Sequence, residues 1–320
     1  MAGLPMELSS ALQALAEEAG GARLEKDARM ISEAYRMRTG TGKRLLTREG
    51  EAAAYAAARM PATYEAAHAA IHSALMASGL APRTLLDCGA GTGAATWAAD
   101  GLLELDQIMC LEREDAMRAV GVRLMRAGGG ALQSAVWQAF DLTDAQPLPK
   151  AALVVEGYML GELAEDMRLP VARRLWDACT EMLVLIEPGT PQGFANLAAV
   201  RRELAGLGAY VAAPCPSGSM SCPMSGEDWC HFAVRVQRTK LHKQLKGGDA
   251  PYEDEKYCYL ALTRTEPENA CAARVLRHPL IAPGRITLTV CEADEKKTRV
   301  VTKKDPLWKR ARKIGAGDGL

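Results

Sequence analysis

The strongest constraint on the fold of this chain is a regular alternation of short apolar strands and helices between residues 84 and 207. The predicted strands occupy residues 84–87, 107–111, 131–138, 151–156 and 182–187, and the helices occupy residues 94–103, 114–127, 166–181 and 196–207. Such alternation is typical of a parallel sheet that carries helices on both faces. A chain of 320 residues is long enough to bury such a core without disulfides. We therefore predict an α/β fold.

The residues on both sides of this region follow other patterns. Apolar residues recur at helical spacing in residues 7–18, 23–38 and 49–78, where Pro61 is expected to start a fresh turn. After residue 208 we predict an irregular loop (214–226), a basic helix (232–245), late strands (256–263 and 285–291) and a hairpin partner (298–303). The chain is thus divided into an N-terminal helical region (1–80), a core (81–208), a cysteine-rich loop with a basic helix (209–255), and late strands with a basic tail (256–320).

The composition excludes some classes of protein. No uncharged apolar run approaches 18 residues, so we predict no membrane-spanning helix. The first twenty residues carry Glu7, Glu17 and Glu18 but no Lys or Arg, unlike a secretory signal or a transit peptide. We therefore predict a cytoplasmic protein.

The net charge is zero, with 39 basic and 39 acidic residues, but the charge is unevenly distributed. Basic blocks occupy residues 36–48, 235–246 and 296–313, and the first two contain no acidic residue. One such block is more often a solvated face, whereas three together suit RNA or another polyanion. We predict neither a membrane nor a DNA partner. The predicted RNA-binding residues are Arg36, Arg38, Lys43, Arg44, Arg235, Arg238, Lys240, Lys303, Lys304, Lys309 and Arg310.

A glycine-rich loop, Asp-Cys-Gly-Ala-Gly-Thr-Gly, follows the first predicted strand at residues 87–93. Glycines between a strand and a helix let the backbone approach a ligand closely, beside the free N–H groups of the helix. The pattern alone would also fit a dinucleotide site or a structural loop. Asp87 is placed to reach the amino group of S-adenosylmethionine, and a helical segment ahead of the first strand is common in class I methyltransferases. We therefore favour S-adenosylmethionine over NAD.

Other carboxylates are expected at the carboxyl ends of the strands, where the cofactor crevice of such a sheet lies. An acid at position 112 can accept both ribose hydroxyls, Asp141 fits a contact to the adenine amine, and Glu156 lines the same crevice. The predicted cofactor-binding residues are Asp87, Gly89, Ala90, Gly91, Gly93, Glu112, Asp141 and Glu156.

No catalytic residue is predicted. Residues 156–160 lack the Asn/Asp-Pro-Pro-aromatic motif of amino-methylating enzymes. The Pro-Cys pair at 214–215, which could serve as a cytosine-C5 nucleophile, follows the fifth strand and not the fourth.

Three of the nine cysteines, Cys215, Cys222 and Cys230, lie within 16 residues of an irregular, proline-rich segment. Three thiolates need a fourth ligand to complete a zinc site or a [4Fe–4S] cluster. The downstream candidates are Cys258, Cys271, Cys291, His231 and His242. We choose Cys291 because it ends a strand at a turn, whereas Cys258 is expected in the core and Cys271 in a helix. Spacing alone leaves a metal centre, ordinary buried thiols and a redox role open.

The remaining candidates have simpler interpretations. Cys88, Cys110 and Cys179 lie in or beside apolar strands or helices and are predicted to be core residues. His68 and His72 are four residues apart on a predicted helix, where packing is favoured over metal binding.

Several motifs together resemble one family. They are Pro-Cys-Pro (214–216), Cys-Pro-Met (222–224), Trp-Cys-His-Phe (229–232), Tyr-Glu-Asp-Glu-Lys (252–256), Glu-Pro-Gly-Thr-Pro (187–191), Arg-Met-Pro-Ala-Thr-Tyr (59–64) and Tyr-Met-Leu-Gly-Glu-Leu (158–163). On these motifs the chain resembles the small-ribosomal-subunit methyltransferase-like family over roughly residues 31–318. The resemblance implies a class I (Rossmann-like) methyltransferase fold and association with small-subunit ribosomal RNA during assembly. It also implies a [4Fe–4S] cluster, with zinc as the alternative metal, on Cys215, Cys222, Cys230 and Cys291.

The resulting hypothesis is a methyltransferase-like core with an N-terminal helical extension, a cysteine-rich metal-binding insertion and a C-terminal hairpin. The metal centre would join the cysteine loop to the hairpin and place the basic blocks on one RNA-binding face. The two alternatives are an active ribosomal RNA methyltransferase, and a zinc-braced methyltransferase of small molecules or proteins.

Overall fold

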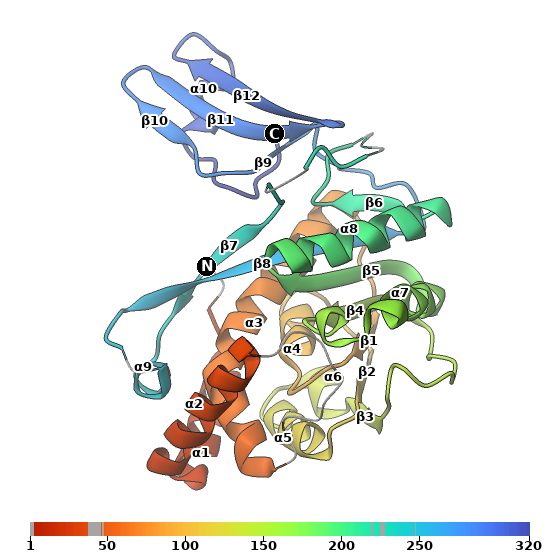
Figure 1. The fold of residues 1–320 in the computed structure, drawn as a ribbon, viewed down its shortest axis with the longest axis vertical. Helices are drawn as coiled ribbons and strands as arrows, with labels where there is room; N and C mark the ends of the chain where they lie inside the picture. The colour runs from red at the N-terminus through yellow and green to blue at the C-terminus, as the bar shows by residue number, and fades with distance from the viewer. Residues whose placement is uncertain are drawn as a thin grey trace.

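An eight-stranded sheet forms the centre of the protein (Figure 1). The computed structural model describes residues 3–37, 46, 48–217, 219, 221–224, 228–246 and 248–320. The strand order is β3-β2-β1-β4-β5-β8-β6, with β7 also paired to β8. The strands are β1 (Thr84–Cys88), β2 (Gln107–Glu112), β3 (Val136–Ala139), β4 (Ala151–Gly157), β5 (Cys179–Pro188), β6 (Tyr210–Ala213), β7 (Phe232–Gln237) and β8 (Tyr252–Thr263). Strands β1 to β5 are parallel, as predicted, whereas β8 runs antiparallel to β5, β6 and β7.

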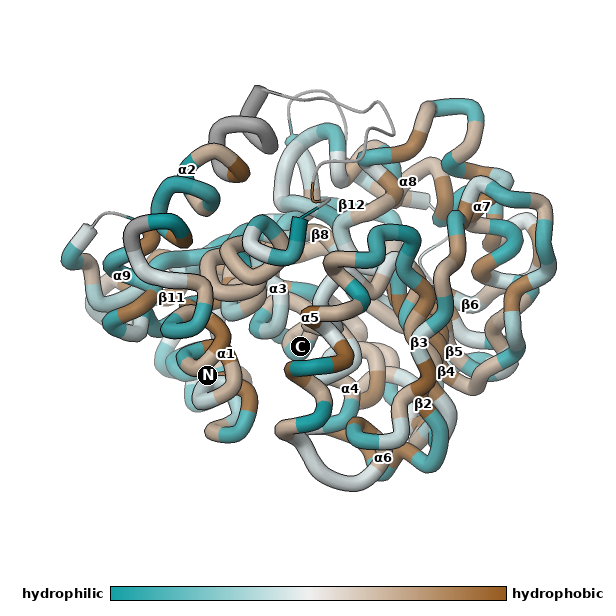
Figure 2. The backbone as a smooth tube through the Cα atoms, turned by 90° about the horizontal axis from the view of Figure 1, so that it is seen from below, coloured by the Kyte–Doolittle hydropathy of each residue, from teal (hydrophilic) through white to brown (hydrophobic). Residues whose placement is uncertain are grey.

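Helices cover both faces of this sheet, so the predicted α/β architecture is confirmed. The helices are α3 (Glu49–Ser78), α4 (Ala94–Asp100) and α5 (Asp115–Met125) on one face, and α7 (Glu165–Ala178) and α8 (Pro191–Gly206) on the other. Successive strand residues point to opposite faces. Leu85 and Val155 therefore join the first core, whereas Leu86 and Val154 join the second. Figure 2 shows the apolar residues concentrated in the stacked central strands.

The N-terminal helices α1 (Met6–Ala19) and α2 (Gly21–Met37) pack against α3. Helix α3 continues through Pro61 for 30 residues, so the proline does not start a separate helix. Most residues of α3 are buried, and many of them are alanines. Because alanine side chains are small, the helix can pack closely against the sheet.

Two predicted elements of the core are wrong in detail. Residues 131–138 were expected to form one strand but divide into α6 (Gly130–Gln133) and β3. The helix expected over 166–181 ends at Ala178, because residues 179–188 form strand β5, whose residues 182–187 are buried in the sheet.

The basic helix expected over residues 232–245 is also wrong. Residues 232–237 form β7, and only α9 (Lys240–Lys246) is helical. The apolar side chains of Phe232, Val234 and Val236 recur with a period of two, which is the signal of a strand. Together β7 and the first half of β8 form a two-stranded ribbon that leads from the sheet to α9 (Figure 1).

A second, smaller sheet follows at the C-terminal end (Figure 1). It contains β9 (Ala273–Val275), β10 (Leu280–Ala282), β11 (Arg285–Glu292) and β12 (Glu295–Thr302), with α10 (Trp308–Ala311) against its buried face. The predicted hairpin is therefore confirmed, with a shorter turn than expected. Cys271 precedes β9 in an irregular segment, so its predicted helical position is wrong.

Candidate functional site

The glycine loop turns sharply at the carboxyl end of β1. Gly89, Gly91 and Gly93 have φ values of 73°, 58° and 90°, a region that favours glycine. A side chain at Gly93 would also collide with Met125, because its Cβ would lie 2.4 Å from the methionine Cε. The loop lines a pocket of about 470 Å³, whose other walls include Tyr55 of α3 and Tyr158 after β4.

Asp87 lies at the base of this pocket and is almost completely buried. Its Oδ2 accepts hydrogen bonds from the backbone N of Thr96 at 3.1 Å and from the Thr96 hydroxyl at 2.6 Å. Burial raises the pKa of Asp87 to about 6, against the opposing effect of these hydrogen bonds. Asp87 therefore holds the start of α4 in place as well as lining the pocket.

Glu112 and Asp141 stand at the carboxyl ends of β2 and β3. Glu112 accepts hydrogen bonds from the backbone N of Gly91 and of Glu114, both at 2.9 Å, so it supports the glycine loop directly. Asp141 accepts from the backbone N and hydroxyl of Thr143 at 2.9 and 2.7 Å. The sheet therefore brings the predicted cofactor-binding carboxylates to one edge, although each also has a local structural partner.

Glu156, at the end of β4, is fully buried on the opposite face of the sheet from α3. Its Oε1 accepts hydrogen bonds from the backbone N of Met159 and Leu160, and its Oε2 has no hydrogen-bond partner among the described residues. Burial, together with the charge of Glu187, raises the pKa of Glu156 well above its usual range. Residue spacing does not indicate this carboxyl pair, because Glu187 lies 31 residues further along the chain and approaches Glu156 only through the pairing of β4 with β5.

We expect the Glu156→Gln variant to be about as stable as the natural protein at pH 5 and more stable by about 1–3 kcal/mol at pH 8. A carboxyl with a raised folded-state pKa contributes stability below its unfolded pKa, and that stability is lost as the pH rises through the folded value. The amide cannot ionise, so the variant escapes this loss. Urea unfolding at both pH values measures the difference, and Glu266→Gln, at an exposed position, serves as the control. If the difference in unfolding free energy between the variant and the natural protein were the same at pH 5 and pH 8, the raised pKa of Glu156 would be contradicted.

The four cysteines chosen as ligands line one pocket of about 610 Å³ between α8 and the small C-terminal sheet. The pairing of the strands explains why the cysteines come together. Tyr257 of β8 pairs with Pro188 on one side and Phe232 on the other, so β6 and β7 share one edge of β8. The cysteine loop (residues 214–231) joins these two strands along that edge, and β11 brings Cys291 to it.

Direct hydrogen bonds hold the cysteine loop against the C-terminal sheet. The backbone N of Ser221 donates to Asp294 at 2.8 Å, and the Ser219 hydroxyl donates to the Ala293 carbonyl at 3.1 Å. Burial raises the pKa of the Cys230 and Cys291 thiols, and the nearby thiols add to the effect. Within the described ranges, no three His, Cys, Asp or Glu side chains form a group that could hold a metal ion.

Four of the other five cysteines have the predicted buried environment, and Cys271 is the exception described above. Cys88, Cys110, Cys179 and Cys258 are buried. Cys258 also lines the thiol pocket, where its Sγ donates to the Cys230 carbonyl at 3.1 Å. The rings of His68 and His72 stack with centroids 6.3 Å apart, in accordance with a packing role.

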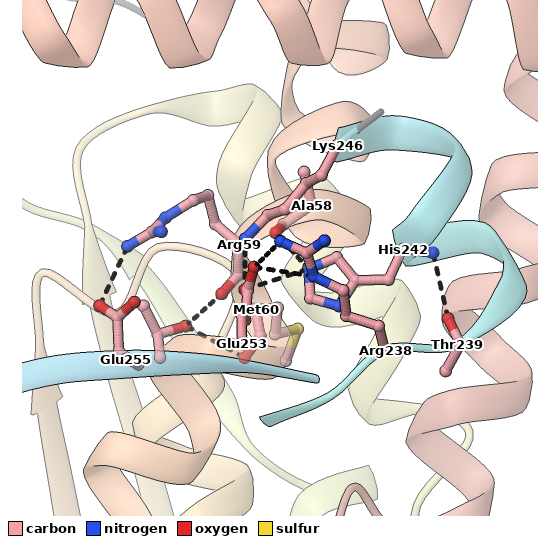
Figure 3. Close-up of polar contacts among 10 residues, drawn as sticks. Ala58, Arg59, Met60, Arg238, Thr239, His242, Lys246, Glu253 and Glu255 are labelled. Carbon is pink, nitrogen blue, oxygen red and sulfur yellow. Dashed lines mark hydrogen bonds and ion pairs between the residues drawn. The ribbon is translucent and has the colours of Figure 1, made fainter. Parts of the chain in front are cut away.

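The predicted RNA-binding cations of the β7–β8 ribbon are paired with acidic residues of β8. Arg235 contacts Asp254 at 3.0 Å, and Arg238 contacts Glu253 at 2.7 Å. Figure 3 shows Arg238, Lys246 and His242 converging on Glu253, beside the Arg59–Glu255 pair. Burial lowers the pKa of His242 to about 4, so this histidine is neutral near pH 7. The motif at 252–256 thus pairs with Arg235, Arg238 and Lys246 of the basic block next to it.

The C-terminal basic residues are different. Lys303, Lys304, Lys309 and Arg310 are exposed and form no ion pair with the described acidic residues, and Lys240 of α9 shares both properties. This C-terminal segment and α9 lie at opposite ends of the ribbon in Figure 1, so the expected single basic face is wrong for these two blocks. Arg38, Lys43 and Arg44 lie outside the described residues, as does the side chain of Arg36.

The strand order, the antiparallel β8 between β5 and β6, and the glycine loop after β1 define a class I methyltransferase fold. The chain belongs to the family described as mitochondrial small ribosomal subunit Rsm22, whose model matches residues 49–320. The family resemblance drawn from the cysteine and Glu-Asp-Glu-Lys motifs is therefore confirmed.

One relative is the human mitochondrial ribosome assembly protein METTL17, which is 28% identical over 228 residues. The match covers 67% of this chain and 49% of the relative, so the chain spans about half the length of that protein. Among solved structures, Synechocystis magnesium protoporphyrin IX methyltransferase with bound S-adenosylmethionine is 10% identical, with a TM-score of 0.43 over 75% of this chain and 97% of that one. A ribosomal protein L11 methylase from Lactobacillus delbrueckii is 13% identical, with a TM-score of 0.37 over 62% and 77%.

Proposed function

We propose that this protein is a methyltransferase-like factor that binds small-subunit ribosomal RNA during ribosome assembly. It would hold S-adenosylmethionine in the glycine-loop pocket and a [4Fe–4S] cluster on Cys215, Cys222, Cys230 and Cys291. The observation that carries the proposal is the convergence of these four thiols on one pocket, at the junction between the core and the C-terminal sheet. Family membership and the name of the human relative support the link to ribosome assembly.

A set of four thiolates suits either a [4Fe–4S] cluster or a tetrahedral zinc ion. The resemblance to the family places the cluster first, with zinc as the alternative. When bound, the cluster would supply a covalent link between the cysteine loop and β11.

The glycine loop supports the proposed cofactor site. The left-handed residues Gly89 and Gly91 line the pocket without a side chain, and Glu112 fixes the loop through the Gly91 amide. Asp87, Gly89, Ala90 and Gly91 line the pocket, which makes them the strongest of the proposed cofactor-binding residues. Of the remaining proposed residues, Gly93, Glu112 and Asp141 would act from its margins. Glu156, buried on the other face of the sheet, would act through the backbone of Met159 and Leu160.

The basic C-terminal segment is the proposed RNA contact. Its cations are exposed, whereas Arg235 and Arg238 of the ribbon are paired with acidic residues. No helix among the described residues is long and apolar enough to cross a membrane. The cytoplasmic location stays a prediction, and the human relative is named as a mitochondrial protein.

Anaerobic purification with iron and sulfide analysis tests the metal centre, and co-sedimentation with small ribosomal subunits tests the partner. We expect about four irons per chain, broad absorption near 400 nm, and protein that moves with immature small subunits. Stoichiometric zinc without colour would support the zinc-braced alternative, and absence from the ribosomal fractions would contradict the assembly role.

A further inference from the structure

Two buried arginines line the thiol pocket from opposite sides. Arg201 belongs to α8 of the core, and Arg274 belongs to β9 of the C-terminal sheet. Each is only 7% exposed. Arg274 stands directly opposite Cys291 in the β9–β11 register. The sequence offered no signal for either residue, because neither belongs to the cysteine loop and the tertiary structure brings both to the pocket.

Both guanidinium groups also hold the backbone of the cysteine loop. Arg201 Nη2 donates to the Ser219 carbonyl at 2.9 Å. Arg274 Nε donates to the Pro214 carbonyl at 2.7 Å, and its Nη1 donates to the Gly317 carbonyl at 2.9 Å. Both arginines line the pocket together with Cys215, so the two cations lie beside the same group of thiols.

Buried charges need compensation, and an arginine keeps its charge at any pH at which a protein folds. Arg274 forms no ion pair with a carboxylate in the described part of the chain, and its hydrogen bonds go to neutral carbonyls. A [4Fe–4S] core in its 2+ state on four thiolates carries a formal charge of about −2. The guanidinium groups of Arg201 and Arg274 would balance that charge, whereas four neutral thiols would offer no compensation for the charge of Arg274.

We propose that Arg201 and Arg274 are charge-compensating residues that retain the metal centre and set its reduction potential. This inference rests on the proposed cluster. Uptake of one electron makes the centre more negative, so a neighbouring cation favours the reduced form. Removing either cation should make reduction harder and loosen the hold of the four thiolates.

The test compares Arg201→Gln, Arg274→Gln and the charge-conserving Arg201→Lys, with Arg202→Gln as the control on the same helix, where the side chain is exposed. Each full-length protein is purified anaerobically and titrated with dithionite as the one-electron reductant, and the visible absorption reports the reduction. Absorption is also followed in excess EDTA, and circular dichroism confirms folding.

We expect each glutamine variant to lower the equilibrium constant for reduction about tenfold, equivalent to a fall of about 59 mV in the one-electron potential. We also expect the glutamine variants to lose absorption in EDTA at least fivefold faster. Arg201→Lys and Arg202→Gln should resemble the natural protein.

A coloured natural protein whose glutamine variants keep the same potential and the same rate of loss would overturn this inference alone. A natural protein without iron would instead refute the proposed cluster. Should the glutamine variants not fold, Arg201→Lys decides, since a tenfold shift with the charge retained would contradict charge compensation.

Discussion

Replacing Cys291 by serine is expected to reduce the iron content from about four atoms per chain to near zero and to abolish the absorption near 400 nm. Serine is a poor ligand for iron in a site built from thiolates. Cys291 is also the only one of the four proposed ligands that belongs to the C-terminal sheet. Its loss should therefore release the cysteine loop from that sheet, and limited proteolysis within residues 214–231 should become at least tenfold faster.

Cys258→Ser is the matched control for this experiment. Cys258 lines the same pocket, and its Sγ donates to the Cys230 carbonyl, a role that a serine hydroxyl can keep. We expect this variant to retain iron and colour. If Cys258→Ser lost the iron while Cys291→Ser kept it, the assignment of the fourth ligand would be wrong.

Replacing Lys303, Lys304, Lys309 and Arg310 together by alanine is expected to weaken binding to small-subunit RNA by about ten- to a hundredfold at physiological salt. Each cation that neutralises a phosphate releases a counterion, so the slope of log affinity against log salt should fall by about 3. Filter binding or fluorescence anisotropy between 50 and 200 mM salt measures both quantities.

The control for this experiment is the double variant Arg235→Ala with Asp254→Ala. Arg235 stacks over Tyr252 at 4.0 Å and contacts Asp254, so the double change removes a paired cation while preserving the net charge. We expect its RNA affinity to change less than threefold. An equal loss of affinity in both variants would indicate that the ribbon contacts RNA, contrary to the pairing seen here.

The elements of the core could be predicted because their signals are local. Apolar strands alternate with helices from residue 84 onwards, and the observed bounds differ by a few residues. The exceptions are instructive. Residues 232–237 belong to the predicted basic helix 232–245, although Phe232, Val234 and Val236 carry the period of a strand. Residues 131–138 are predicted as one strand, although Gly130 begins a short helix.

The candidate site could be predicted only in part. The glycine loop and the four cysteines could be identified from the sequence because glycine indicates a close backbone approach and cysteine indicates a possible metal ligand. The structure brings the four cysteines to one pocket. The Glu156–Glu187 pair and the two arginines of the thiol pocket were missed. Their environments depend on which strands become neighbours, and no spacing along the chain reports that.

The sequence by itself determined the fold class, the family and the chemical identity of the candidate ligands, because periodicity and motif spacing are properties of neighbouring residues. Only the tertiary structure decided which cations have an acidic partner and which are exposed for binding a polyanion. Arg235 and Arg238 belong to an acid-free block of sequence, yet strand register places Asp254 and Glu253 against them. The exposed lysines after β12 have no such opposite strand. The physical reason is that a charge is neutralised by what lies within a few ångströms in space, and a β-ribbon supplies that partner from a distant part of the chain.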